Sequence, residues 1–168
     1  LLLSEIIPKT IGAKYWDKLA GATTVTINAS TLSATQTLIL SDAAVDSNMN
    51  VTSGAGADQI TLGTGADTVS SGAGNDIITG TTGGSNVVDT GAGVDTMVLS
   101  ASTSESVSMG AGNDIITAAG NLDALDTIDG GEGTDTLTIT ATLSAASVIG
   151  GVSNIEVIIW IKCHDTLF

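Results

Sequence analysis

The octapeptide GAGNDIIT occupies residues 72–79 and recurs, letter for letter, at residues 110–117. An identical octamer is not expected by chance in a chain of 168 residues, and internal repeats decide the architecture wherever they occur. Outward from these two copies, residues 53–138 show a period of nine, with glycine at positions two and four, aspartate at position six and an aliphatic residue at position eight. This period predicts the fold.

Nine copies follow one another almost without interruption. They occupy residues 53–61, 62–70, 71–79, 81–89, 90–98, 100–108, 109–117, 121–129 and 130–138. Extra residues stand at 80, at 99 and at 118–120, each time after an odd-numbered copy. Copies that alternate between two sides of a stack would gather such insertions at one corner. The same alternation places the two octamers on one side, two coils apart.

Each copy has the composition of a short strand that ends in a tight turn. Glycine permits a turn with positive φ, and in a three-residue strand around position eight only the central side chain points inward. One such strand cannot bury its aliphatic residue alone, but successive copies can stack into a continuous core. The sequence therefore predicts an all-β solenoid in which two copies complete a coil.

The glycine, aspartate and aliphatic positions resemble those of the RTX family, whose hemolysin-type calcium-binding nonapeptide has the pattern G-G-x-G-x-D-x-U-x with U aliphatic. The resemblance covers residues 53–138, about half of the chain. It implies a right-handed parallel β-roll with calcium ions between the loops of successive turns. It also implies that the position-six aspartates and the backbone carbonyls of the glycine-rich loops supply the ligands.

Residue by residue, the family pattern arranges the position-six residues in two rows, and the aspartates among them are the candidate calcium ligands. One row contains Asp58, Asp76, Asp95, Asp114 and Asp135, over inner residues Ile60, Ile78, Met97, Ile116 and Leu137. The other contains Asp67, Asn86, Glu105 and Asp126, over Val69, Val88, Val107 and Ile128. Asn86 and Glu105 depart from the family pattern, so filled and empty central sites both stay open for this row. The carbonyl ligands would come from Gly54, Gly56, Gly63, Gly65, Gly72, Gly74, Gly91, Gly93, Gly110, Gly112, Gly131 and Gly133.

Charge suggests why calcium would matter. The chain has 18 acidic residues, four lysines and a formal net charge of −14, and residues 19–161 contain no lysine or arginine. Carboxylates stacked ~4.8 Å apart repel by roughly 3 kcal/mol at an effective dielectric constant of 20, and several such pairs rival the ~5–15 kcal/mol stability of a domain. We expect the roll to be disordered without calcium and to fold on binding it. The acidic surface argues against a nucleic-acid partner.

Composition divides the chain into four parts. These are an N-terminal junction or cap at 1–20, a β-strand flank at 21–52, the calcium-binding roll at 53–138, and a C-terminal β flank and cap at 139–168. No apolar run approaches the ~20 residues of a membrane helix, so no membrane insertion is expected. With one histidine, there is no H-E-x-x-H motif, and neither G-x-S-x-G nor a phosphate loop occurs. The sequence predicts no enzyme.

Three functions stay open at this point. The Thr- and Ser-rich flanks resemble those of RTX-type bacterial surface-layer proteins. This implies a structural module that leaves the cell by type I secretion, folds outside on calcium, and contacts copies of itself or other surface proteins. The first alternative is the secretion and folding module of an RTX exoenzyme with its catalytic domain elsewhere. The second is a solenoid that binds ice or glycans, although the mixed residues at positions seven and nine disfavour ice.

Overall fold

The computed structural model describes residues 24–41, 47–81, 83–99, 104–118, 122–140 and 150–161. Within these ranges every element of regular secondary structure is a β-strand. The all-β prediction is therefore confirmed. The same residues include no helix with the length and apolar character needed to cross a membrane. The predicted cap at 1–20 and residues 162–168 lie outside the described residues.

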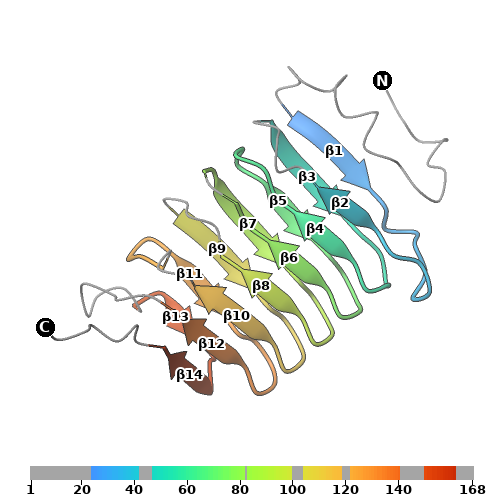
Figure 1. The fold of residues 1–168 in the computed structure, drawn as a ribbon. Coiled ribbons are helices and arrows are strands. Elements are labelled where there is room, and N and C mark those ends of the chain that lie inside the picture. The colour runs from blue at the N-terminus through green and yellow to red at the C-terminus, as the bar shows by residue number, and fades with distance from the viewer. Residues whose placement is uncertain are drawn as a thin grey trace, which may run out of the picture.

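Fourteen strands among the described residues form two parallel sheets that face each other in a β-solenoid of about six turns (Figure 1). Sheet A contains β1 (Thr24–Asn28), β3 (Asn48–Thr52), β5 (Thr68–Ser70), β7 (Ser85–Asp89), β9 (Ser104–Ser108), β11 (Thr127–Asp129) and β13 (Val152–Ser153). Sheet B contains β2 (Ile39–Ser41), β4 (Gln59–Thr61), β6 (Ile77–Thr79), β8 (Thr96–Val98), β10 (Ile115–Ala118), β12 (Thr136–Ile139) and β14 (Val157–Trp160). Odd-numbered copies form sheet B strands and even-numbered copies form sheet A strands, so the predicted alternation is confirmed.

The register aligns equivalent positions of the repeat on neighbouring strands. Ile60 pairs with Ile78, and Ile78 pairs with Met97. In sheet A, Val69 pairs with Val88. The two octamers lie on β6 and β10, with only β8 between them in sheet B. One residue per three-residue strand points inward, as the period of nine predicts.

The core is the space between the two sheets. Ile78, Met97, Ile116 and Leu137 have no exposed surface, and the sheet A residues opposite are nearly as buried. The extra residues between copies contribute to this core, because Leu99 is 1% exposed and Ala118 is fully buried. The insertions at the turn from sheet B to sheet A are therefore partly packing residues and not only loop.

Both sheets continue beyond the nine copies. Strands β1 to β3 precede residue 53, and β13 and β14 follow residue 138, all in the same parallel register. The two ends differ in burial: Leu40 on β2 is 3% exposed, whereas the inward positions Ile158 and Trp160 on β14 are 49% and 51% exposed. The inward residue Leu40 of the first rung is thus buried, whereas the inward residues of the last rung are half exposed.

Candidate metal centre

The position-six residues of the odd-numbered copies form one column along sheet B. We call this set the sheet B column; it contains Asp58, Asp76, Asp95, Asp114 and Asp135. All five are at least 99% buried. Each precedes an inward-facing aliphatic residue by two positions, so the alternation of the strand turns it toward the interior as well. The predicted stacking of these aspartates is present.

A ladder of hydrogen bonds joins the sheet B column. The Asp95 N–H donates to Asp114 Oδ1 at 2.7 Å, and the Asp76 N–H donates to Asp95 Oδ1 at 2.8 Å. The same contact recurs along the column at 2.6–2.8 Å, from the Leu38 N–H to Asp58 and from the Asp114 N–H to Asp135. Each carboxylate therefore holds the backbone of the preceding rung with one of its two oxygens.

The second oxygen distinguishes the middle of this column from its start. Among the described residues, the Oδ2 atoms of Asp76, Asp95, Asp114 and Asp135 are buried without a hydrogen-bond partner. In contrast, Asp58 Oδ2 accepts the Gly54 N–H at 3.3 Å. A buried charged oxygen that lacks a partner is costly. Four such oxygens on successive rungs form a row of hydrogen-bond acceptors without donors, and a row of this kind suits cations.

Burial raises the pKa values of these carboxyl groups. Loss of hydration, opposed by the hydrogen bond from the Asp58 N–H and assisted by the neighbouring Asp95 and Asp58 charges, raises the pKa of Asp76 to about 6. Burial, with the charge of the next aspartate, also raises the pKa values of Asp95 and Asp114. Burial therefore disfavours the ionised form of these three aspartates.

The glycine-rich loops bring the backbone of successive coils into close contact. Positions two and four take positive φ in the later odd-numbered copies, for example 152° at Gly93 and 151° at Gly112. A Cβ atom at Gly93 would collide with the Gly74 carbonyl oxygen. Gly56 does not take a positive φ, but a Cβ atom there would collide with the Gln36 carbonyl. Glycine is thus needed at these positions for close approach, and at only some of them for backbone conformation.

Sheet A has a second column in which the chemistry changes from rung to rung. This sheet A column contains Asp67, Asn86, Glu105 and Asp126, all buried. The Asp67 N–H donates to Asn86 Oδ1 at 2.9 Å, and Asn86 Nδ2 donates to Glu105 Oε1 at 3.2 Å. The Glu105 N–H donates to Asp126 Oδ1 at 2.8 Å. Asn86 and Glu105 therefore continue the ladder despite their departure from the repeat pattern.

The sheet A column has fewer vacant oxygens than the sheet B column. Asp67 Oδ2 accepts the Gly63 N–H at 3.3 Å, and Asp126 Oδ2 accepts the Asp123 N–H at 2.7 Å. Burial raises the pKa values of Asp67 and Asp126. Asn86 adds a neutral amide between two acids, which lowers the repulsion along this column.

Sequence reasoning missed a further copy at 151–159. Asn154, at position four, has a φ of 49°, the one positive φ of a non-glycine residue in the described ranges. Glu156, at position six, accepts the Asp135 N–H at 2.8 Å and so extends the sheet B ladder by one rung. The signal was available, because Glu156 precedes Ile158 by the same two positions as each aspartate precedes its aliphatic residue.

A ladder of buried hydroxyl groups at position one was also missed. Ser71 Oγ donates to the Thr90 carbonyl at 3.0 Å, and Thr90 Oγ1 donates to the Met109 carbonyl at 2.6 Å. Ser53 Oγ makes the same contact with the Ser71 carbonyl at 2.6 Å. The hydroxyls of Ser71 and Thr90 lie beside Asp76 and Asp95 and lower the pKa values of these aspartates, but their protons are directed to the backbone of the next coil.

Oxygen is the donor type of both columns, and carboxylate and carbonyl oxygens are the ligands that calcium prefers. No three acidic, histidine or cysteine side chains of the described residues converge on one point. The vacant Oδ2 atoms and the closely stacked carbonyls therefore fit calcium as a shared set of side-chain and backbone donors.

Comparison with protein families found one match. The model of the RTX calcium-binding nonapeptide repeat, four copies long, matches residues 52–84, 81–101 and 110–137. Comparisons with curated proteins and with solved structures gave no match. The matched residues contain all five aspartates of the sheet B column and three members of the sheet A column, Asp67, Asn86 and Asp126, whereas Glu105 lies outside them.

Proposed function

Because this chain carries the calcium-binding nonapeptide repeats of the RTX family, we propose that it is a calcium-dependent structural module of a secreted bacterial cell-surface protein. A solenoid of such repeats is typically structural. One observation carries the proposal: four buried aspartate oxygens on successive rungs have no protein partner, in a chain whose residues 19–161 offer no lysine or arginine. Once these carboxylates are ionised, cations from outside would neutralise them.

The sheet B column supplies the carboxylate ligands in this proposal. Asp76, Asp95, Asp114 and Asp135 use one oxygen for the ladder and leave the other for the ion. Asp58, Asp67 and Asp126 would complete the set by giving up a weaker or local contact to a backbone N–H. Carbonyls of the position-two and position-four glycines would provide the other donors, since calcium takes 6–8 oxygens.

Calcium binding and folding are one reaction in this proposal. Without the ion, the buried charges oppose the packing of the coils; with it, the same carboxylates tie adjacent loops together. Extracellular calcium modules commonly bind at ~10⁻⁴ to 10⁻³ M, so the chain would stay unfolded in a calcium-poor cytoplasm and fold after export. A surface layer or an adhesin suits a rigid module of this kind.

A calcium titration of the full chain, followed by circular dichroism with magnesium as the control, tests the proposal. We expect a cooperative gain of β signal with calcium alone. Asp95→Ala should raise the calcium midpoint more than Asn86→Ala, because Asp95 has a vacant oxygen and Asn86 carries no charge. A β signal that is complete in chelator and unchanged by calcium would show that the metal has no structural role.

A further inference from the structure

The outer face of sheet B carries no charged side chain. Its outward residues stand at positions seven and nine of the odd-numbered copies and of the flanking strands. Along position seven, the register aligns Ile39, Gln59, Ile77, Thr96, Ile115, Thr136 and Val157. Position nine contains only serine, threonine, valine and isoleucine. Most of these side chains are β-branched and therefore stiff, so the face is uncharged and conformationally restricted.

Aliphatic side chains recur on every second rung at position seven of this face. Ile39 is 71% exposed, Ile77 44% and Ile115 43%. A polar residue, Gln59 or Thr96, lies between each pair of isoleucines. With strands ~4.8 Å apart, the aliphatic side chains stand roughly 9.6 Å apart along the stack. The row is thus a regular series of apolar ridges separated by polar gaps one strand wide.

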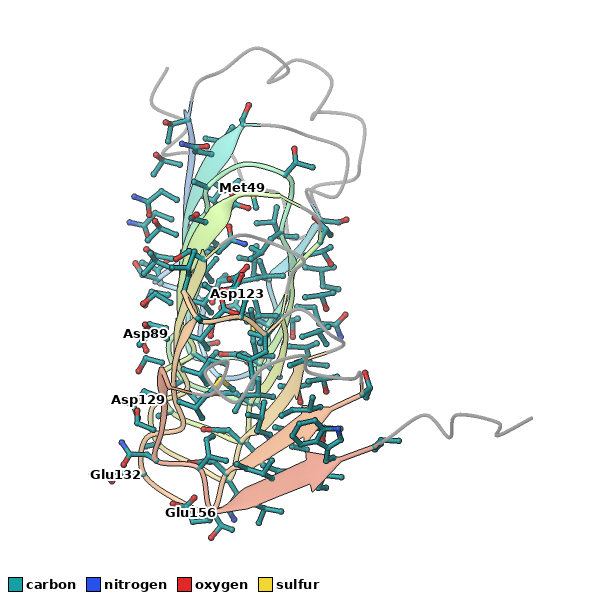
Figure 2. The ribbon with its side chains drawn as sticks, turned by 90° about the vertical axis from the view of Figure 1, so that its left-hand side faces the viewer. Met49, Asp89, Asp123, Asp129, Glu132 and Glu156 are labelled. Carbon is teal, nitrogen blue, oxygen red and sulfur yellow. The ribbon has the colours of Figure 1, made fainter. Side chains whose placement is uncertain are left out.

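The exposed acids lie elsewhere on the described surface. Asp89 is exposed and Asp129 half-buried on the outer side of sheet A, Glu132 is exposed in a glycine-rich loop, and Glu156 is exposed beside the last rung (Figure 2). All four lysines fall outside the described residues. Two copies that met through the outer face of sheet A would bring carboxylates together with no cationic side chain of that face to pair with them. Of the outer faces of the two described sheets, that of sheet B avoids this repulsion.

We propose that the outer face of sheet B binds the same face of a second copy of this chain. Flat β-sheets pack face to face at ~10 Å, and a two-fold axis makes such a contact self-complementary. If the axis passes midway between two rungs, each Ile77 or Ile115 of one copy meets a threonine or glutamine gap of the other. Ridges then enter gaps, and no charge is buried.

The size of this face sets the strength of the contact. Seven strands at ~4.8 Å and three residues at ~3.3 Å give a face of roughly 30 by 10 Å, about 300 Å² for each copy. A stable interface buries about 800 Å² for each partner. The pairing is therefore weak in dilute solution and becomes important where copies are concentrated, as on a surface. A second copy of the chain is thus the partner of the proposed surface module. This inference rests on the proposed function, because the contact requires the calcium-bound fold.

Sedimentation equilibrium of the full chain in saturating calcium tests this proposal, over a concentration series that reaches the millimolar range. We expect the weight-average mass to rise from that of one chain, 16.6 kDa, toward twice that value. Higher sodium chloride should strengthen the association, because salt screens the repulsion between acidic copies while the contact itself contains no charge.

Matched variants locate the contact. Ile77→Asp with Ile115→Asp should weaken association at least tenfold, whereas Val87→Asp, which alters a 51% exposed aliphatic residue on sheet A, should leave it within twofold of the wild type. Ile77→Thr with Ile115→Thr should weaken it less, and it keeps a residue that the row already holds at Thr96 and Thr136. Circular dichroism in calcium verifies the fold of each variant.

Two results would overturn the proposal. One is a wild-type chain that stays at the mass of a single copy at every concentration while its calcium-induced β signal is complete, a result that leaves the proposed function intact. The other is a loss of association with Val87→Asp as large as that with the sheet B pair.

Discussion

Replacing Asp76 by asparagine should stabilise the calcium-free solenoid and weaken the calcium-bound one. Asp76 is fully buried, and its Oδ1 accepts the Asp58 N–H at 2.8 Å. Asparagine retains an Oδ1 acceptor of the same length, so the ladder survives. The substitution removes the charge, which lies between Asp58 and Asp95, and replaces the buried Oδ2 with an NH2 group.

The pKa of Asp76 gives the size and sign of this effect. Burial raises it from 3.8 to about 6, and a change of about two units corresponds to ~3 kcal/mol against the ionised form, or about 1–2 kcal/mol after screening by water and salt. The calcium-free fold binds this proton more tightly than the unfolded chain does. This contribution to its stability is therefore fully present below pH 4 and is lost as the pH rises through about 6.

Circular dichroism in calcium-free buffer between pH 5 and 8 measures the effect. The wild-type β signal should fall as the pH rises through about 6, and Asp76→Asn should keep more of it at pH 7.5. In a calcium titration the order should reverse, with a higher midpoint for the variant. Asp89→Asn, an exposed site on sheet A, is the control and should change neither. If Asp76→Asn has less β signal than the wild type in calcium-free buffer at pH 7.5, the buried charge of Asp76 is not what destabilises the fold.

Three other substitutions test separate parts of the structure. Gly112→Ala should lower the free energy of unfolding by about 2–3 kcal/mol in urea with saturating calcium, because φ is 151° and the new Cβ would collide with the Gly93 carbonyl. Val94→Ala, at an exposed loop position, is the control. An equal loss of stability in both variants would contradict the close-approach explanation. Asn86→Asp places a carboxylate between Asp67 and Glu105 and should lower the stability of the calcium-free fold by about 1–3 kcal/mol. Calorimetry should find more calcium bound to each chain of the variant. An unchanged number of bound calcium ions would mean that the middle of sheet A holds no calcium site. Ser71→Ala removes the hydrogen bond to the Thr90 carbonyl at 3.0 Å and should cost about 1 kcal/mol in the same urea assay, so an unchanged midpoint would show that the hydroxyl ladder contributes nothing.

The inner rows and their register were predictable because the repeat permits only one solution. A three-residue strand has one inward position, and Ile78 and Met97 occupy it in equivalent copies. The alternation of copies between the sheets followed from the positions of the insertions. The stacking of the aspartate rows was predictable for the same reason, since position six has a fixed place relative to position eight.

Other features depend on contacts between coils, which the repeat pattern does not encode. Asn154 and Glu156 replace the glycine and aspartate of the pattern, yet their backbone conformation and hydrogen bond belong to a further copy. The role of Gly56 follows from the approach of the Gln36 carbonyl, a residue outside the nine copies. The burial of Leu99 was hidden because an insertion suggests a surface loop. The assignment of calcium ligands stays a prediction.

Because copies alternate between the two sheets, the odd or even place of a copy in the chain decides which sheet it joins. Loss of one nonapeptide, such as residues 62–70, would send every later copy to the opposite side. Each outer surface would then change character partway along: the uncharged rows that contain Ile77 and Ile115 would continue the polar side of β3, and Asp89 would move to the other side. The loss of two adjacent copies would shorten the solenoid and leave both surfaces uniform. Duplications and deletions that are retained in such a gene should therefore contain an even number of copies, because the two outer surfaces of the protein differ in character.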